Sequence, residues 1–238
     1  MSSSPRDYRH QPLDAADYPD MGDKWLFAGV DLAPNEGLET GVAVVDRARG
    51  LVRLDKVNTN TQILCILESL GPSRNVVVSL DMPKSLSIQG EWRQEEIRMF
   101  PLRLYRPHSG EFTDRWGARA WALYDELVRR GFTVMLYFNY QAKNRLELFI
   151  PFRTRTPRGC RALQGMIKER LNIAEIPGNL SPISVLDAMI GAYLSWLTYV
   201  GTPQEHFVIS RTLGARWVAE PLRRFIPKSV RKPRRRRY

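Results

Sequence analysis

Three aspartates lie at places where apolar segments end or are interrupted. Asp31 and Asp81 each follow a short apolar run, and Asp187 lies within the otherwise apolar segment 183–200. Carboxylates that follow neighbouring parallel strands can gather at one edge of a sheet. Like charges brought together there need a proton, a basic partner or a divalent cation. Mg²⁺ or Mn²⁺ suits such oxygen ligands where no His or Cys stands beside them.

Each aspartate also has an ordinary structural interpretation. An Asp at a strand end often forms a turn, as Asp81 could before Met82 and Pro83, and a single Asp in a helix usually faces solvent. Asp187 belongs to a strip at helical spacing that is either a solvent-facing edge or a contact face. The strip consists of Ser184, Asp187, Gly191, Ser195 and Thr198. Gly191 leaves room for another element to approach closely.

Other catalytic chemistries lack the residues they need. The three histidines are widely separated, and the two cysteines have no metal-ligand spacing. These residues are His10, His108, His206, Cys65 and Cys160. The pattern disfavours a zinc enzyme and a Cys/His nucleophile, and the sparse cysteines suit a reducing, cytoplasmic compartment.

The elements that would position Asp31 and Asp81 follow from the hydrophobic pattern. Segments 25–30, 40–46 and 51–57 predict a three-stranded meander. A helix capped by Thr59 or Asn60 then runs to Gly71, and the buried strand 75–80 follows. A crossover helix between strands implies a parallel pair, so we expect the fourth strand beside the first.

The second half of the chain predicts more helix than strand. Segment 84–115 has no clean period apart from a short helix at 93–99, and a helix at 115–130 leads into a fifth strand at 132–138. Two further helices are predicted at 158–171 and 183–200, the latter capped by Ser181 or Ser184. Segment 183–200 is apolar enough to suggest a membrane span, but Asp187 favours a buried helix and no membrane partner. We therefore predict an α/β fold with a central mixed five-stranded sheet flanked by helices.

Charge is distributed unevenly along the 238 residues. Nine of the eleven net positive charges lie between residues 222 and 238, so the rest of the chain is nearly neutral. We expect a flexible leader at 1–24, one domain at 25–220 and a basic tail at 221–238. The tail residues that would attract nucleic acid are Arg234, Arg235, Arg236 and Arg237.

A second basic group precedes and enters the helix at 158–171. It comprises Arg153, Arg155, Arg158 and Arg161, with Lys168 and Arg170 further along. These side chains either hold a phosphate backbone or form a solvated helix face. Phe149 and Phe152 lie among them and either stack on unpaired bases or pack into the core.

Four segments together resemble the DUF429 family of ribonuclease-H-like predicted nucleases. They are Gly29-Val-Asp-Leu-Ala33 with Thr40-Gly-Val-Ala-Val44, Val78-Ser-Leu-Asp-Met-Pro83, Leu186-Asp-Ala-Met-Ile-Gly-Ala-Tyr193, and Pro157-Arg-Gly-Cys-Arg161. The resemblance spans most of 26–199. It implies a ribonuclease-H-like fold, in which Asp31, Asp81 and Asp187 are catalytic and bind Mg²⁺ or Mn²⁺, and hydrolysis of phosphodiester bonds in DNA or RNA.

The general pattern of this fold implies two metal ions. Asp31 would bridge the two ions, and Asp81 and Asp187 would be the outer ligands. The chain departs from the family at two peripheral acids. Ser184 stands where the family often has Asp, and Met135 to Phe138 contain no acid. Three other acids are candidates to replace the missing carboxylate: Glu36, Glu39 and Asp114.

Two rival functions remain open. One is a catalytically inactive nucleic-acid-binding protein on the same fold, which the missing acids favour. The other is a phosphotransferase of the actin-like fold, which begins with the same strands and an Asp. The chain is short for the two related halves of such an enzyme and lacks a second Gly-rich phosphate loop. We therefore expect a metal-dependent nuclease.

Overall fold

A computed structural model describes residues 24–81, 110–139, 142–143, 146–200, 208–213 and 216–221. The leader, the short helix predicted at 93–99 and Arg234 to Arg237 lie outside the described residues. The predicted domain boundaries therefore stay predictions.

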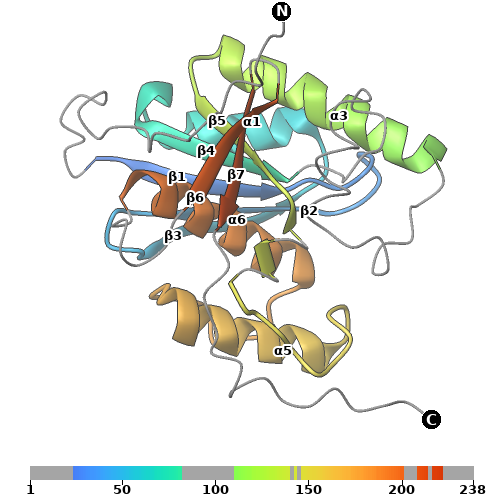
Figure 1. The fold of residues 1–238 in the computed structure, drawn as a ribbon, viewed down its shortest axis with the longest axis vertical. Helices are drawn as coiled ribbons and strands as arrows, with labels where there is room; N and C mark the ends of the chain where they lie inside the picture. Colours follow the sequence, from blue (N-terminus) through green and yellow to red (C-terminus); the bar gives the residue numbers. More distant parts are fainter. Residues whose placement is uncertain are drawn as a thin grey trace, which may run out of the picture.

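The described residues form one mixed sheet of seven strands, in the order β3-β2-β1-β4-β5-β7-β6 (Figure 1). The strands are β1 (Leu26–Asp31), β2 (Thr40–Val45), β3 (Leu51–Val57), β4 (Val76–Asp81), β5 (Thr133–Tyr137), β6 (Val208–Leu213) and β7 (Arg216–Pro221). The first three form an antiparallel meander, and β4 and β5 run parallel to β1. The predicted meander, crossover and parallel strands are confirmed.

The sheet is larger than the five strands that we expected. A hairpin of β6 and β7 extends it, with β7 parallel to β5. Segment 208–221 mixes polar and charged residues with apolar ones and has no clean period of two. Its strands are decided by pairing with the β5 edge, which a local pattern does not reveal.

Two helices cover one face of the sheet. α1 (Asn60–Glu68) is capped by Thr59, whose hydroxyl accepts from the Gln62 backbone N–H in a capping box. α3 (Gly110–Arg129) starts five residues before the predicted helix and ends before Gly131, whose φ is +84°. Their buried side chains share a core with every second residue of the strands.

The other face is covered by α6 (Ile183–Tyr199), which packs against β1, β2 and β4. A Cβ on Gly29 would lie 2.0 Å from the Ala188 carbonyl oxygen, and one on Gly41 would lie 2.1 Å from that of Ser184. The backbone of α6 therefore rests directly on the strands. The helix is buried, as expected, and no helix among the described residues is long and apolar enough to cross a membrane.

The predicted cap of α6 was wrong. Its N-cap is Pro182, and no side chain caps it. The Ser184 hydroxyl instead donates to Glu39, and the Ser181 backbone N–H donates to Gln164. The Ser184 hydroxyl is therefore engaged by Glu39 and does not cap the helix.

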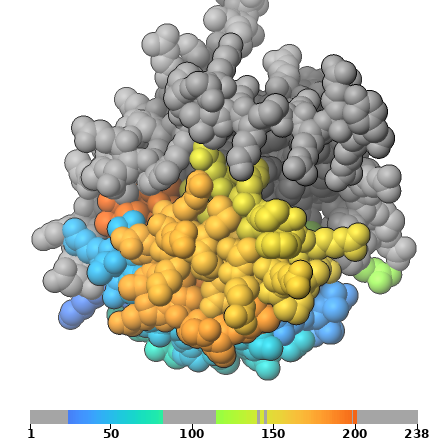
Figure 2. Space-filling model, turned by 90° about the horizontal axis from the view of Figure 1, so that it is seen from below, coloured from blue at the N-terminus to red at the C-terminus, as the bar shows by residue number. Residues whose placement is uncertain are grey.

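The predicted helix at 158–171 is two elements. α5 (Pro157–Met166) continues into a π-helical turn, η4 (Ile167–Leu171), and a short 3₁₀ turn, η2 (Ser73–Asn75), precedes β4. α5 lies on the side of α6 that faces away from the sheet (Figure 1). Seen from below, α5 and its neighbouring segments form much of the surface (Figure 2).

Candidate active site

The carboxyl edge of the parallel strands aligns two of the aspartates with a tyrosine. Val30 pairs with Leu80, so Asp31 and Asp81 occupy the next position of β1 and β4. Asp81 in turn pairs with Tyr137 of β5. Residues in register share a face of the sheet, and this row lies on the α6 side. Asp81 is buried and Asp31 is half-buried.

Asp187 reaches this edge from α6 and is only 7% exposed. Ser184, Gly191 and Ser195 of the same strip are also buried, so the solvent-facing interpretation of the strip was wrong. The Tyr137 hydroxyl donates to the Asp187 backbone oxygen over 3.1 Å. A Cβ on Gly191 would lie 2.8 Å from the Tyr137 hydroxyl oxygen, so the glycine makes the close approach possible. The structure thus brings Asp31, Asp81 and Asp187 together.

Deeper in the same interface, a buried pair of hydroxyls joins α6 to the sheet. The Ser79 and Ser195 Oγ atoms lie 2.6 Å apart, and Ser195 Oγ also donates to the Ala28 carbonyl oxygen over 3.1 Å. Buried hydroxyls cost free energy unless they are paired, so these contacts favour one position of the helix.

Asn139 joins the two strand-end aspartates and was missed in the sequence. Its backbone N–H donates to Asp81 Oδ1 over 3.0 Å, and its Nδ2 donates to Asp31 Oδ1 over 3.2 Å. Asn139 Oδ1 is buried and has no hydrogen-bond partner. The sequence could have indicated Asn139, because it directly follows the predicted strand 132–138, just as Asp31 and Asp81 follow their strands.

Lys143 is the second residue that the sequence did not reveal. Its Nζ lies 2.6 Å from Asp187 Oδ1 and 2.7 Å from Oδ2, with side chains only 18% and 10% exposed. Only Oδ2 is aligned for a hydrogen bond, which leaves the buried Oδ1 without one. No local pattern around Lys143 predicts this pairing.

Burial dominates the electrostatics of the three carboxyl groups. It raises the pKa of Asp31 well above its usual value, with the charges of Asp187 and Asp81 adding to the effect. Burial also raises the pKa of Asp81 to about 7, although the Asn139 backbone N–H opposes the rise. Burial raises the pKa of Asp187 as well, against the charge of Lys143. The cluster therefore favours bound protons or cations over three free charges.

The oxygen atoms of the site are of the type that binds a divalent cation, but they are not arranged around one common position. Three carboxylates and the unpartnered Asn139 Oδ1 are the hard oxygen ligands that Mg²⁺ or Mn²⁺ prefers. However, no three His, Cys, Asp or Glu side chains within the described ranges are placed to hold one ion together. Lys143 already contacts Asp187, and Asn139 donates to the other two aspartates.

The structure distinguishes two of the candidate substitute acids. Glu39 accepts from Ser184, one helical turn before Asp187, and pairs with Lys56 over 3.0 Å. Glu36 instead accepts from the Asn60 backbone N–H at the start of α1. The side chain of Asp114 lies outside the described part of the chain. Of Glu36 and Glu39, only Glu39 therefore contacts the helix that carries Asp187.

The four predicted arginines of the 153–161 segment are all exposed: Arg153, Arg155, Arg158 and Arg161. The charge of Arg155 lowers the pKa of Asp187, which places this guanidinium near the carboxylates. Phe149 and Phe152 are 62% and 46% exposed, so they do not pack into the core. The segment therefore exposes four cations and two aromatic side chains, and of these Arg155 acts on the charge of Asp187.

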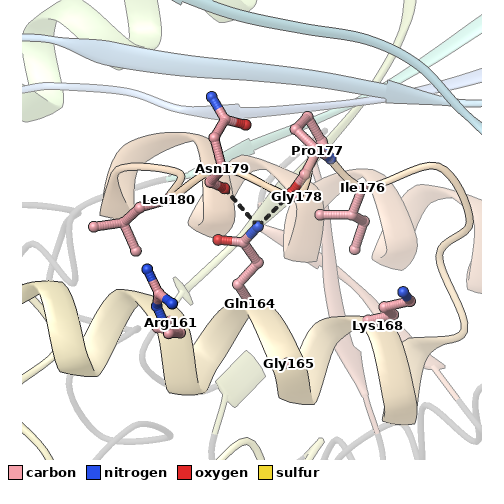
Figure 3. A pocket seen from close by; sticks show the side chains of 9 residues that line it. All are labelled: Arg161, Gln164, Gly165, Lys168, Ile176, Pro177, Gly178, Asn179 and Leu180. Atoms are coloured by element: carbon pink, nitrogen blue, oxygen red, sulfur yellow. Dashed lines mark hydrogen bonds between the residues drawn. The ribbon is translucent and has the colours of Figure 1, made fainter.

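A shallow groove lies between α5 and residues 176–180 (Figure 3). Arg161, Gln164 and Lys168 line its α5 side, and Gln164 Nε2 donates to the carbonyl oxygens of Pro177 and Asn179. None of the three aspartates lines it. Its volume of about 230 Å³ is below the roughly 300–1,000 Å³ of typical small-molecule sites.

Comparison with known proteins gave matches to solved structures alone. No family model matches the chain, and no curated protein matches it. One similar structure is Thermus thermophilus RuvC in complex with a Holliday junction substrate, at 16% identity and a TM-score of 0.41. Another structure of Thermus thermophilus RuvC has 16% identity and a TM-score of 0.43. Each alignment covers 83% of this chain and 99% of the RuvC chain. The α/β fold class, a mixed sheet flanked by helices, rests on the strand order and the crossover described above.

Proposed function

We propose that this protein is a divalent-metal-dependent nuclease that hydrolyses phosphodiester bonds in DNA or RNA. The observation that carries the proposal is the convergence of Asp31, Asp81 and Asp187 at the carboxyl edge of β1 and β4. We also propose that the chain belongs to the DUF429 family, on the sequence motifs around Asp31, Asp81 and Asp187.

Asp31 and Asp81 would hold the metal, with Asn139 Oδ1 as a further oxygen donor and the Asp187 carboxylate beside them. Bound Mg²⁺ or Mn²⁺ supplies Lewis-acid stabilisation of the phosphate charge and makes water a stronger nucleophile. Asn139 fixes the orientation of Asp31 and Asp81 through its two hydrogen bonds. Tyr137 holds the backbone of Asp187 in place.

Nucleic acid would bind along the segment that carries Arg153, Arg155, Arg158 and Arg161. The charge of Arg155 lowers the pKa of Asp187, so Arg155 would contact a phosphate close to the site. Phe149 and Phe152 would stack on unpaired bases. Arg234 to Arg237 would add attraction without sequence selectivity.

The proposal is tested by incubating the purified full-length protein with single-stranded, duplex and branched DNA and with RNA. Cleavage should require Mn²⁺ or Mg²⁺ and should stop in EDTA. The cleavage rates of the variants Asp31→Asn and Asp187→Asn should be at least about 100-fold lower than that of the wild-type protein. Circular dichroism checks that both variants are folded. Cleavage at the wild-type rate in both variants would contradict the assignment.

A second candidate function is a nucleic-acid-binding protein without catalytic activity. Two observations favour it: Lys143 contacts the carboxylate of Asp187, and Ser184 replaces a peripheral acid of the family. This candidate predicts binding of the same nucleic acids without cleavage in Mn²⁺. The two functions are therefore separated by the same assay.

A further inference from the structure

The ammonium group of Lys143 lies where a metal ion bound to the Asp187 carboxylate would lie, and the contact is more buried than an ordinary surface ion pair. Nζ lies 2.6 and 2.7 Å from the two carboxylate oxygens, and both side chains are largely buried. A Mg²⁺ or Ca²⁺ ion bound by carboxylate oxygens lies at roughly 2.0–2.6 Å from them. An ammonium at this position and a divalent ion on the same side of Asp187 exclude each other by size and by charge.

The backbone around Lys143 is fixed by the core and not by the ion pair alone. The backbone N–H of Ala142, which is buried, donates to the Phe138 carbonyl oxygen over 2.9 Å. The Lys143 carbonyl oxygen accepts from the backbone N–H of Leu148, a buried residue, also over 2.9 Å. These backbone hydrogen bonds therefore position Lys143 next to Asp187, on a segment that is attached to the residue after β5.

The buried charges balance with one divalent ion. Asp31, Asp81 and Asp187 carry three negative charges when ionised, and Lys143 supplies one positive charge. The remaining two negative charges equal the charge of a single divalent cation. A second divalent ion would leave an excess of two positive charges in a largely buried site, which is electrostatically costly.

We propose that Lys143 is a built-in counter-ion that takes the place of one metal, so that the site binds a single divalent ion on the Asp31 and Asp81 side. This inference rests on the proposed function, and it replaces the two ions implied by the fold pattern. It also accounts for the poor placement of three acidic ligands around one ion. Asp187 is satisfied by the lysine instead.

The test is the number of Mn²⁺ ions bound by the full-length protein, measured by isothermal titration calorimetry and by electron paramagnetic resonance of free Mn²⁺. Wild-type protein should bind one ion, and Lys143→Met should bind two. Lys143→Arg retains the charge and should bind one. Lys24→Met is the matched control, since Lys24 is exposed and precedes β1 at the end opposite Asp31, and it should also bind one.

Two bound ions in the wild-type protein would overturn the inference, and so would equal stoichiometry in wild type and Lys143→Met. The wild-type measurement can overturn the inference even if Lys143→Met does not fold. Cleavage activity with two bound ions would leave the proposed function standing and reject this inference alone. Absence of both Mn²⁺ binding and cleavage would instead contradict the proposed function, and the inference would fall with it.

Discussion

Asn139 and Lys143 stabilise the buried aspartates in different ways. Asn139 is neutral and donates hydrogen bonds to Asp31 and Asp81 from its backbone and its side chain. Lys143 is charged and neutralises Asp187. Hydrogen bonds satisfy the carboxylate lone pairs but leave the charge in place, so Asp31 and Asp81 still need a proton or a cation.

The raised pKa of Asp81 predicts how stability depends on pH without metal. The folded-state pKa is about 7 against an ordinary 3.8, so between these values the folded state binds more protons than the unfolded state. The free energy of unfolding should therefore fall as pH rises from about 4 to about 7. The contribution of Asp81 is on the order of a few kcal/mol. Urea unfolding in EDTA at pH 5 and pH 8 measures it.

Asp81→Asn is the variant that isolates this contribution. Its side chain stays neutral at both pH values, so it should lose less stability than wild type between pH 5 and pH 8. An equal loss in both proteins would show that Asp81 does not carry the effect.

At the scale of elements, the position of α6 depends on glycines in two strands. The strands present backbone and not side chains at Gly29 and Gly41, so the helix lies close enough for Asp187 to reach the strand ends. The strip that includes Ser195 then faces the sheet, where the Ser195 hydroxyl forms a hydrogen bond with the Ser79 hydroxyl. Helix packing at this distance is what converts three separate aspartates into a cluster.

Gly29→Ala should therefore destabilise the protein by about 3 kcal/mol in urea unfolding, because the added methyl overlaps the backbone of α6 and the helix must shift. Gly165→Ala in α5 is the matched control. A Cβ there meets nothing within 4 Å, so the change should be neutral or stabilising by up to about 1 kcal/mol. Similar free energies of unfolding for the two variants would contradict the close packing.

At the scale of the molecule, the layers of the fold decide on which side of the sheet the exposed arginines lie. α1 and α3 cover one face of the sheet, and α6 with α5 outside it covers the other (Figure 1). Arg158 and Arg161 are exposed residues of α5, which lies on the outer side of α6 (Figure 1). A nucleic acid bound to them would lie on the same side of the sheet as Asp187.

This arrangement predicts the salt dependence of nucleic-acid binding. In EDTA, Arg158→Ala combined with Arg161→Ala should weaken binding and reduce the slope of log K against log salt by up to about 2 for duplex DNA. Fluorescence anisotropy at several NaCl concentrations measures the slope. Arg129→Ala is the control, because Arg129 lies on α3 and pairs with Glu126 over 2.6 Å. Because the control removes one charge and the double variant removes two, a slope loss in the control about half as large would assign the effect to net charge and not to this surface.

The sequence by itself determined the elements that form the carboxyl edge of the parallel strands and two of the residues there. The apolar runs before Asp31 and Asp81 have the length and composition of buried strands, and a helix between them requires a parallel pair. Those local facts predict that Asp31 and Asp81 can meet at one edge of the sheet, and the pairing of Val30 with Leu80 places them side by side. The same rule would have selected Asn139, whose position after the fifth strand was visible in the sequence.

Only the tertiary structure decided which face of α6 is buried, which residue neutralises Asp187 and how far the sheet extends. Helical spacing places Ser184, Asp187 and Ser195 on one strip but does not say whether the strip meets solvent or the sheet. Lys143 reaches Asp187 across 44 residues of sequence, and β7 joins β5 through edge pairing. These contacts depend on packing between distant segments, which local periodicity does not encode.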